Sequence, residues 1–311
     1  MTTPQEPLAG LTVLERGWLS SNNLVIHAAA GEAGAVLVDC GHVNHAEQTV
    51  ALVRHALAGA PLARIVNTHL HSDHCGGNAT LQRAFGAPLF IPPGQAGAVA
   101  SWDAAALSYQ ATGQRCERFE PQGVLHPGEV LAAGGRAWQV IGAPGHDPHS
   151  LMLFDAEHGV LVSADALWEH GFGVVFPEIA GEPGFDDVAE VLDLIETLPV
   201  RVVIPGHGKP FTDVAAALAR SRSRLAAFVA QPERHARHAA KVLLKYHLME
   251  EQSQAQAALR DWAAATPLFT GVWQAHARRE AETPHDWCDA LTAELVAAGA
   301  LQLQAGVVTD C

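Results

Sequence analysis

The chain has 311 residues, of which 49% are hydrophobic and 17% charged, and this composition predicts a globular protein long enough for two domains. No stretch approaches the roughly 20 uninterrupted apolar residues of a membrane span, and the first residues lack the basic segment and apolar core of a signal peptide. Five cysteines, an odd number without framework spacing, favour reduced thiols. We therefore expect a cytoplasmic protein without a membrane partner.

The net charge of −14 is unevenly distributed along the chain. Residues 1–214 contain 9 Lys and Arg against 23 Asp and Glu, whereas residues 215–311 contain 10 of each kind. A strongly acidic region repels polyanions at long range, so nucleic acid is disfavoured as the main substrate without being excluded.

The apolar runs before residue 212 predict short strands and a few helices in alternation. The predicted helices are 44–57, 78–85 and 185–197. Strands at both ends of the region with helices between them fit an α/β sandwich whose sheets pack face to face. We interpret residues 1–212 as one catalytic domain. The predicted strands are 11–14, 23–27, 35–39, 64–67, 88–91, 137–141, 151–155, 159–163 and 201–205.

After Pro210 the pattern changes to helices, predicted at 214–230, 232–247, 253–264 and 283–298. Alternating apolar and polar residues from 299 onward predict a terminal hairpin. Helices closed by a hairpin resemble a winged helix, so we expect residues 213–311 to form a small helical, winged-helix-like domain. Residues 220–245 contain seven Lys or Arg and one Glu. This basic stretch could contact RNA, neutralise the acidic first domain, or be a solvated helix face.

Candidate metal ligands are most concentrated directly after the apolar run 63–66, where His69, His71, Asp73 and His74 fall within six residues. Neutral imidazole and carboxylate are the ligands that a borderline divalent cation such as zinc prefers. At a strand end, residues two apart point the same way, so His69 and His71 can share one ion. Asp73 and His74 follow where the chain turns toward a helix, and they can face a second ion.

Three more candidate ligands follow at long range: His146, Asp165 and His207. Each comes shortly after an apolar, strand-like run and has Gly or Pro around it. This pattern is typical of ligands on loops at one edge of a sheet, held there by a rigid scaffold.

Taken in order, these seven residues resemble the metallo-β-lactamase superfamily over about residues 10–212. The resemblance implies a four-layered αβ/βα sandwich and two metal ions, with Asp165 bridging them. It also implies that Asp39, at the end of a strand, orients a ligand histidine through its ring N–H, although a turn former before Gly41 is an equal interpretation. The implied ligands are His69, His71 and His146 for the first ion, and Asp73, His74 and His207 for the second.

Two divalent ions, zinc first with iron or manganese as alternatives, can lower the pKa of a shared water. We expect a hydroxide bridging the ions to attack a small-molecule acyl substrate, with Asp73 as the catalytic residue that orients it. Asp165 at the bridging position favours the branches that resemble glyoxalase II, the β-lactamase-like protein 2 group, lactonases and ribonucleases over antibiotic hydrolysis.

No strong general acid is evident, and the candidates are His149, Tyr109, His170 and Lys209. Such a site favours good leaving groups, namely thioesters, activated esters or lactones. Loops at 17–23, 101–115 and 168–184 could form pocket walls or simple surface packing. Two other functions stay open: a single-strand-specific endoribonuclease and a mononuclear iron persulfide dioxygenase. The sequence leaves open whether the protein forms a homo-oligomer.

Overall fold

The computed structural model describes residues 6–311, and its first sheet has six strands in the chain's own order. β1 to β3 run antiparallel, and β3 to β6 run parallel. Because consecutive parallel strands need a crossover, helices fall between them and cover one face of this sheet. The strands are β1 (Leu11–Leu14), β2 (Asn23–Ile26), β3 (Ala35–Val38), β4 (Leu62–Val66), β5 (Leu89–Ile91) and β6 (Gly123–Val124).

The second sheet has five strands in the order β11-β10-β9-β8-β7. Only β10 and β11 are parallel, because α7 connects them, and the other neighbours form antiparallel hairpins. The strands are β7 (Val130–Ala133), β8 (Arg136–Gly142), β9 (Leu151–Asp155), β10 (Val160–Ala164) and β11 (Val202–Pro205).

The two sheets face each other across a shared apolar core that includes Ile26, Trp138, Leu153 and Ile204. Every residue of β2, β3, β9 and β10 is buried, as expected for strands covered on both faces. This explains why their sequences read as continuous apolar runs and not as alternating ones.

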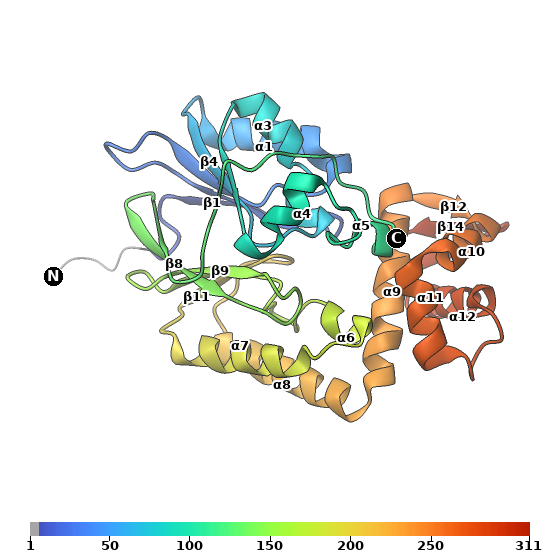
Figure 1. Cartoon of the computed structure of the whole chain (residues 1–311). Helices are drawn as coiled ribbons and strands as arrows, with labels where there is room; N and C mark the ends of the chain where they lie inside the picture. The colour runs from blue at the N-terminus through green and yellow to red at the C-terminus, as the bar shows by residue number, and fades with distance from the viewer. Residues whose placement is uncertain (1–5) are drawn as a thin grey trace.

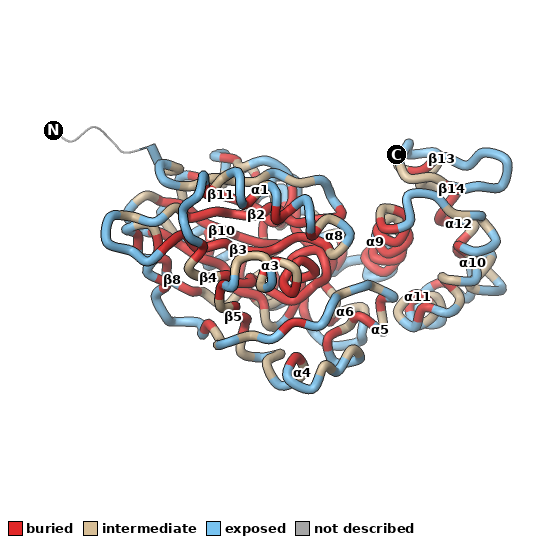
Figure 2. The backbone as a smooth tube through the Cα atoms, turned by 90° about the horizontal axis from the view of Figure 1, so that it is seen from above, coloured by how far each residue is buried: buried red, intermediate tan, exposed pale blue. Residues whose placement is uncertain are grey.

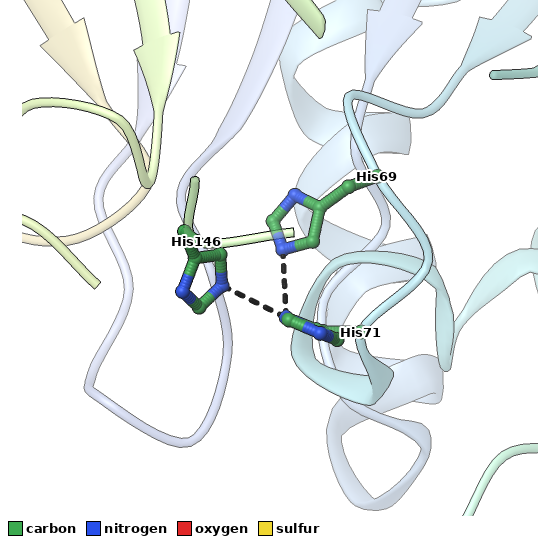
Figure 3. A group of neighbouring side chains, drawn as sticks. All are labelled: His69, His71 and His146. Carbon is green, nitrogen blue, oxygen red and sulfur yellow. Dashed lines mark hydrogen bonds between the residues drawn. The ribbon is translucent and has the colours of Figure 1, made fainter. Parts of the chain in front are cut away.

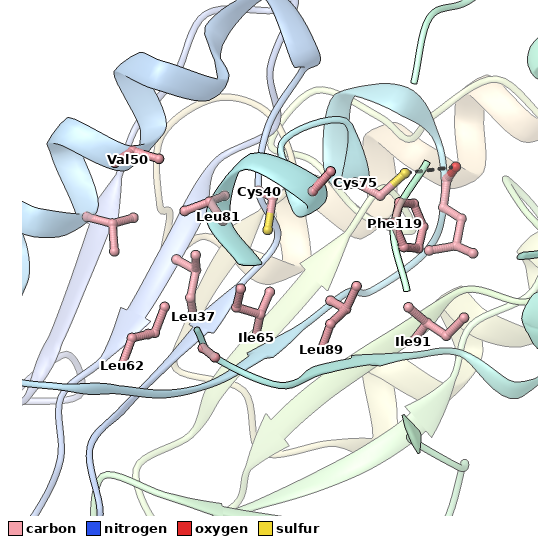
Figure 4. Close-up of a cluster of buried hydrophobic side chains, with 14 of the residues drawn as sticks. Leu37, Cys40, Val50, Leu62, Ile65, Cys75, Leu81, Leu89, Ile91 and Phe119 are labelled. Carbon is pink, nitrogen blue, oxygen red and sulfur yellow. Dashed lines mark hydrogen bonds between the residues drawn. The ribbon is translucent and has the colours of Figure 1, made fainter. Parts of the chain in front are cut away.

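Helices cover the outer face of each sheet and complete four layers (Figure 1). On the first sheet, α1 (Ala46–Leu57) and α3 (Asn78–Phe85) bring Val50 and Leu81 into a cluster with Leu37, Ile65 and Leu89 (Figure 4). On the second sheet, α7 (Phe185–Thr197) and α8 (Val214–Ala230) supply the outer cluster. The structure therefore confirms the predicted αβ/βα sandwich.

The C-terminal part is built around α9 (Pro232–Glu251), whose buried residues face both the sandwich and the remaining elements (Figure 2). A three-stranded sheet in the order β12-β14-β13 closes it. The winged-helix likeness and the division at residue 212 stay predictions. Within residues 6–311 no helix is long and apolar enough to cross a membrane. The remaining elements are β12 (Ser253–Ala255), α10 (Gln256–Ala265), α11 (Pro267–Val272), a π-helical turn (Trp273–Ala277), α12 (Pro284–Ala297), β13 (Leu301–Gln304) and β14 (Val307–Asp310).

Most predicted elements occur within one or two residues of their expected bounds, and β9, α7 and α8 match them fully. The prediction of a helix starting at Ser253 was wrong, because residues 253–255 form β12, which pairs with β14 more than 50 residues later. A local pattern carries no information on such a distant partner. The α11 segment and the π-helical turn were not predicted, and the 168–184 loop contains a short helix, α6 (Phe176–Ala180).

Candidate metal centre

The His69–His74 run lies where β4 ends and the chain turns into the short helix α2 (Ser72–Cys75). His71 is still extended, with φ −67° and ψ 151°, and precedes the helix, whereas Asp73 and His74 lie within it. This change of backbone conformation lets one short segment contribute to two different groups of side chains. All of these side chains are buried or nearly so.

The first group contains three imidazoles, those of His69, His71 and His146, which converge from two loops (Figure 3). The His71 Nδ1 atom lies 3.1 Å from His69 Nε2 and 2.8 Å from His146 Nε2. Three ring nitrogens this close to one another form a trigonal set of lone-pair donors, which is the geometry that a single divalent ion needs.

The second group contains Asp73, His74, Asp165 and His207. His207 Nε2 lies 3.0 Å from an Asp73 carboxylate oxygen, and His74 Nε2 lies 3.4 Å from Asp165 Oδ1. The other oxygen of Asp165, Oδ2, lies 3.4 Å from His146 Nε2 in the first group. The same oxygen lies 3.8 Å from His207 Nε2, so this carboxylate faces both groups.

His74 provides the sharpest test of whether these residues fit a metal. Its Nδ1–H donates to Asp39 Oδ2 at 2.8 Å, which leaves Nε2 directed toward the second group. Nε2 is buried and forms no hydrogen bond, although oxygens of Asp165 and Asp73 lie 3.4 and 3.8 Å away. A ring nitrogen and two carboxylates that face one another in this way, too far apart to bond directly, form a donor set for a divalent cation. The residues present therefore fit an ion at this position.

Two hydrogen bonds hold the Asp39 carboxylate in place, which favours a role in orienting His74 over that of a simple turn former. The Thr68 backbone N–H and the Thr68 hydroxyl donate to its two carboxylate oxygens at 2.8 and 2.7 Å. Asp39 adopts a left-handed φ of 58°, which is uncommon for non-glycine residues, although Asp tolerates it better than most.

Close backbone packing holds two further site residues in position. His146 Nδ1 donates to the Val174 carbonyl at 2.6 Å, which leaves Nε2 free to accept or ligate. A Cβ on Gly173 would lie 2.3 Å from the His146 ring, and a Cβ on Gly206 would lie 2.1 Å from Asp165 Oδ1. Glycine is required at both places because any side chain would displace a site residue.

The surroundings shift histidine pKa values in opposite directions in the two groups. Burial lowers the pKa of His71 and of His146 from 6.5 to about 4, so both rings are neutral near pH 7. Burial also acts on His74, but the carboxylates of Asp165, Asp39 and Asp73 outweigh it and raise the His74 pKa well above 6.5. For Asp73 burial is opposed by His74 and His207, and the pKa falls to about 2.

Aromatic rings lie beside both groups of predicted ligands. The Trp18 ring, 57% exposed, stacks on His207 with 5.2 Å between centroids. Trp168 contacts His207 edge-on and donates its indole N–H to Asp165 Oδ1 at 3.2 Å. Phe176 lies against His71 and His146. The 17–23 and 168–184 loops therefore line the site, as the pocket-wall interpretation requires.

The four candidate general acids do not converge on the site. The Tyr109 hydroxyl is buried and donates to the Leu70 carbonyl at 2.8 Å. His170 is 80% exposed beside Glu169, and Lys209 is exposed. The His149 ring is packed against Gly94. Within residues 6–311 none of the four forms a hydrogen bond or ion pair with the seven predicted ligands.

Two contacts to the site were not anticipated from the sequence. Buried Asp147 places its carboxylate 3.7 Å from His71 Nε2, and its position directly after His146 was the available signal. The Tyr246 hydroxyl on α9 is 2.8 Å from the Ser72 hydroxyl, so the C-terminal part buttresses the helix that carries Asp73. No local pattern pointed to Tyr246.

Comparison with known proteins agrees with this geometry. The family model described as "Metallo-beta-lactamase superfamily" matches residues 16–207. An acyl-coenzyme A thioesterase, MBLAC2, from Gallus gallus is 27% identical over 169 residues, which cover 47% of this chain and 56% of that protein. The chain thus spans about half the length of the relatives of this kind. A hydroxyacylglutathione hydrolase from Anaeromyxobacter dehalogenans is 30% identical over 232 residues, covering 73% and 78%.

Solved structures show the same fold. A metallo-beta-lactamase family protein, TTHA1429, from Thermus thermophilus superposes with a TM-score of 0.57 at 21% identity, covering 98% of this chain and 99% of that one. The BLEG-1 B3 metallo-beta-lactamase matches with a TM-score of 0.53 at 26% identity, covering 67% and 96%. The chain belongs to the metallo-β-lactamase superfamily.

Proposed function

We propose that this protein is a binuclear metal-dependent hydrolase of small thioesters. The observation that carries the proposal is the pair of adjoining His/Asp groups, which are linked by Asp165 and contain a buried His74 Nε2 that forms no hydrogen bond. Such a donor set suits two divalent ions that share a carboxylate. The relatives described as acyl-coenzyme A thioesterase and hydroxyacylglutathione hydrolase both cleave thioesters, which supports this substrate class.

Each residue has a role in this proposal. His69, His71 and His146 would hold one ion, and Asp73, His74 and His207 would hold the other, with Asp165 between them. When bound, the ions would polarise the scissile carbonyl and bring water to a reactive protonation state at neutral pH. Asp73 would in addition accept a hydrogen bond from the attacking water and fix its direction. Asp39 would keep the His74 ring in the orientation that presents Nε2.

The side chains around the site indicate which kind of leaving group the protein can expel. Within residues 6–311, none of the four candidate general acids contacts the seven predicted ligands. A thiol ionises near pH 8.5, so a thiolate can depart without prior protonation, unlike an amide nitrogen. The apolar rings of Trp18, Trp168 and Phe176 would pack against the acyl chain. We therefore place thioesters before esters and lactones.

Metal analysis of protein purified without chelator, followed by a substrate panel, tests the proposal. We expect about two ions per chain, zinc first with iron or manganese as alternatives, and the highest kcat/KM on a thioester. One iron per chain with oxygen-dependent turnover of a persulfide would replace it with the dioxygenase alternative. Efficient cleavage of single-stranded RNA without thioester turnover would replace it with the nuclease alternative.

A further inference from the structure

A surface cavity of about 610 Å³ lies where α8 meets α9, and its lining is strongly basic. No Asp or Glu is among the side chains that line it. The volume is within the range of small-molecule sites, roughly 300–1,000 Å³. The charged and titratable lining residues are Arg220, Arg224, Arg234, Arg237, His238 and Lys241.

Three of these arginines lack an acidic counterpart. Within the lining, Arg237 and Lys241 share Glu294, and outside it Arg222 pairs with Asp193 and Glu196, while Lys245 pairs with Asp310. Within residues 6–311, no carboxylate lies within 4.0 Å of Arg220, Arg224 or Arg234. All three unpaired arginines therefore line the cavity, whereas the two basic residues of this stretch outside it have acidic partners.

The same short loop contacts both this cavity and the candidate metal centre. On the cavity side, Arg220 Nε donates to the Glu169 carbonyl at 2.8 Å, and the Arg224 guanidinium lies over the Phe172 ring at 5.7 Å. On the metal side, Trp168 donates to Asp165, and Gly173 lies against the His146 ring. This loop therefore lies between the two sites, and a substrate that occupies both would have to pass it.

We propose that the cavity binds the phosphate groups at the nucleotide end of an acyl-coenzyme A thioester. This inference rests on the proposed thioesterase function and names its substrate class. Coenzyme A carries three phosphates, and arginine forks bind phosphate oxygens in a bidentate manner. The anionic groups of glutathione are two carboxylates, accompanied by an ammonium group, and they would leave several of the cavity's cations unmatched. A compact polyphosphate also suits a bounded cavity better than an extended RNA strand.

Direct binding gives the first test, independent of turnover. Adenosine 3′,5′-bisphosphate is titrated calorimetrically into the wild-type protein, the double variant Arg220→Gln/Arg234→Gln and the control Arg222→Gln. The two mutated arginines are exposed, so folding should be preserved. Loss of a charge-assisted contact typically costs about 1.5–3 kcal/mol, so we expect binding at least about tenfold weaker in the double variant. The control should match the wild type, and equal affinity in all three proteins would overturn the proposal.

Kinetics give the second test, using one acyl group on coenzyme A and on pantetheine, which lacks the nucleotide phosphates. We expect KM for the coenzyme A thioester to rise about tenfold or more in the double variant, and kcat/KM for the pantetheine thioester to change by a much smaller factor, the part due to the lost Arg220 contact with the 168–173 loop. Hydrolysis of both thioesters with no change in either KM would overturn the cavity assignment alone. Hydrolysis of neither, with bisphosphate binding intact, would refute the thioesterase function and support the phosphate site. RNA binding that the double variant loses, without bisphosphate binding, would overturn the proposal in favour of a nucleic-acid site.

Discussion

The two side-chain groups of the candidate metal centre arise from the same short stretch of chain but differ in charge. The first consists of three neutral imidazoles, and burial holds the pKa of His71 and His146 near 4. The second contains two carboxylates, which raise the pKa of His74 and have their own pKa values lowered. A cation entering the first group therefore meets three neutral rings with carboxylates only beside them, whereas one entering the second meets two carboxylates that belong to the group itself.

This difference gives the two positions separate tasks in the proposed hydrolase. The carboxylate-containing group would hold its cation more by charge, while the imidazole group would leave more of the cation's charge available to polarise a carbonyl. Asp165, which faces both groups, couples them. We expect five substitutions to test whether the two groups differ in this way.

The largest effect is expected from Asp165→Asn, because this substitution removes the charge that faces both groups. Loss of one preorganised charge-stabilising contact typically costs about 10²–10³ in kcat, and we expect at least that loss in thioester turnover. Elemental analysis should show reduced occupancy of both positions. Unfolding followed by circular dichroism serves as the control for fold. Near-normal turnover with two ions bound would show that the groups are not coupled through Asp165.

Asp73→Asn should affect only the second group. We expect turnover to fall by about 10²-fold, by analogy with removal of a preorganised contact, while about one ion per chain stays bound to the three imidazoles. Stoichiometry and kcat are measured on the same preparation. Loss of both ions together would show that the two groups act as a single site and do not bind their ions separately.

Asp39→Asn tests the orientation of His74. Loss of a partner that orients a ligand histidine typically reduces metal affinity or activity by about 10–100-fold, so we expect an effect below that of Asp73→Asn. The measurement is competition with a fluorescent chelator. Asp103→Asn, an exposed acidic residue in another loop, is the matched control. Unchanged metal affinity in Asp39→Asn would return this residue to the role of a simple turn former.

The imidazole group should also make the metal-free protein sensitive to acid. In the folded state the pKa of His71 and His146 is lowered from 6.5 to about 4, so the unfolded chain binds more protons between these values. Stability is therefore lost as pH falls through this window. His74 has the opposite sign, since its pKa is raised. We expect thermal unfolding of chelator-treated protein to show a smaller decrease in Tm from pH 7 to pH 5 in His71→Asn than in wild type. An identical decrease in the two proteins would contradict the assignment.

The smallest effect is expected from His170→Ala, at the exposed end of the aromatic loop. The side chain is 80% exposed and beside Glu169, so it makes no contact with either group among the described residues. Exposed substitutions usually change stability by less than about 0.5 kcal/mol, and we expect kcat/KM to stay within about twofold. A large loss of kcat with a shifted pH profile would instead identify His170 as a proton donor that moves inward when substrate binds.

The sequence was most informative where local chemistry and local periodicity coincide. The spacing of His69, His71, Asp73 and His74 sets which side chains can share a group, because side-chain direction follows from extended and helical backbone geometry. The apolar spacing of α7 determined its bounds in the same way. The strand β12 was missed because its assignment depends on β14, far along the chain.

Other features depend on contacts between distant segments, and these appear only in the folded chain. The position of the Asp165 carboxylate between the two groups and the contact from Tyr246 to Ser72 are of this kind. The pairing of basic residues is another example, because the sequence shows seven Lys or Arg in residues 220–245 but not which of them have acidic partners. Sequence alone determined the donor types and their order along the chain. Tertiary structure decided which lone pairs and charges remain unmatched, because burial and long-range packing set that balance.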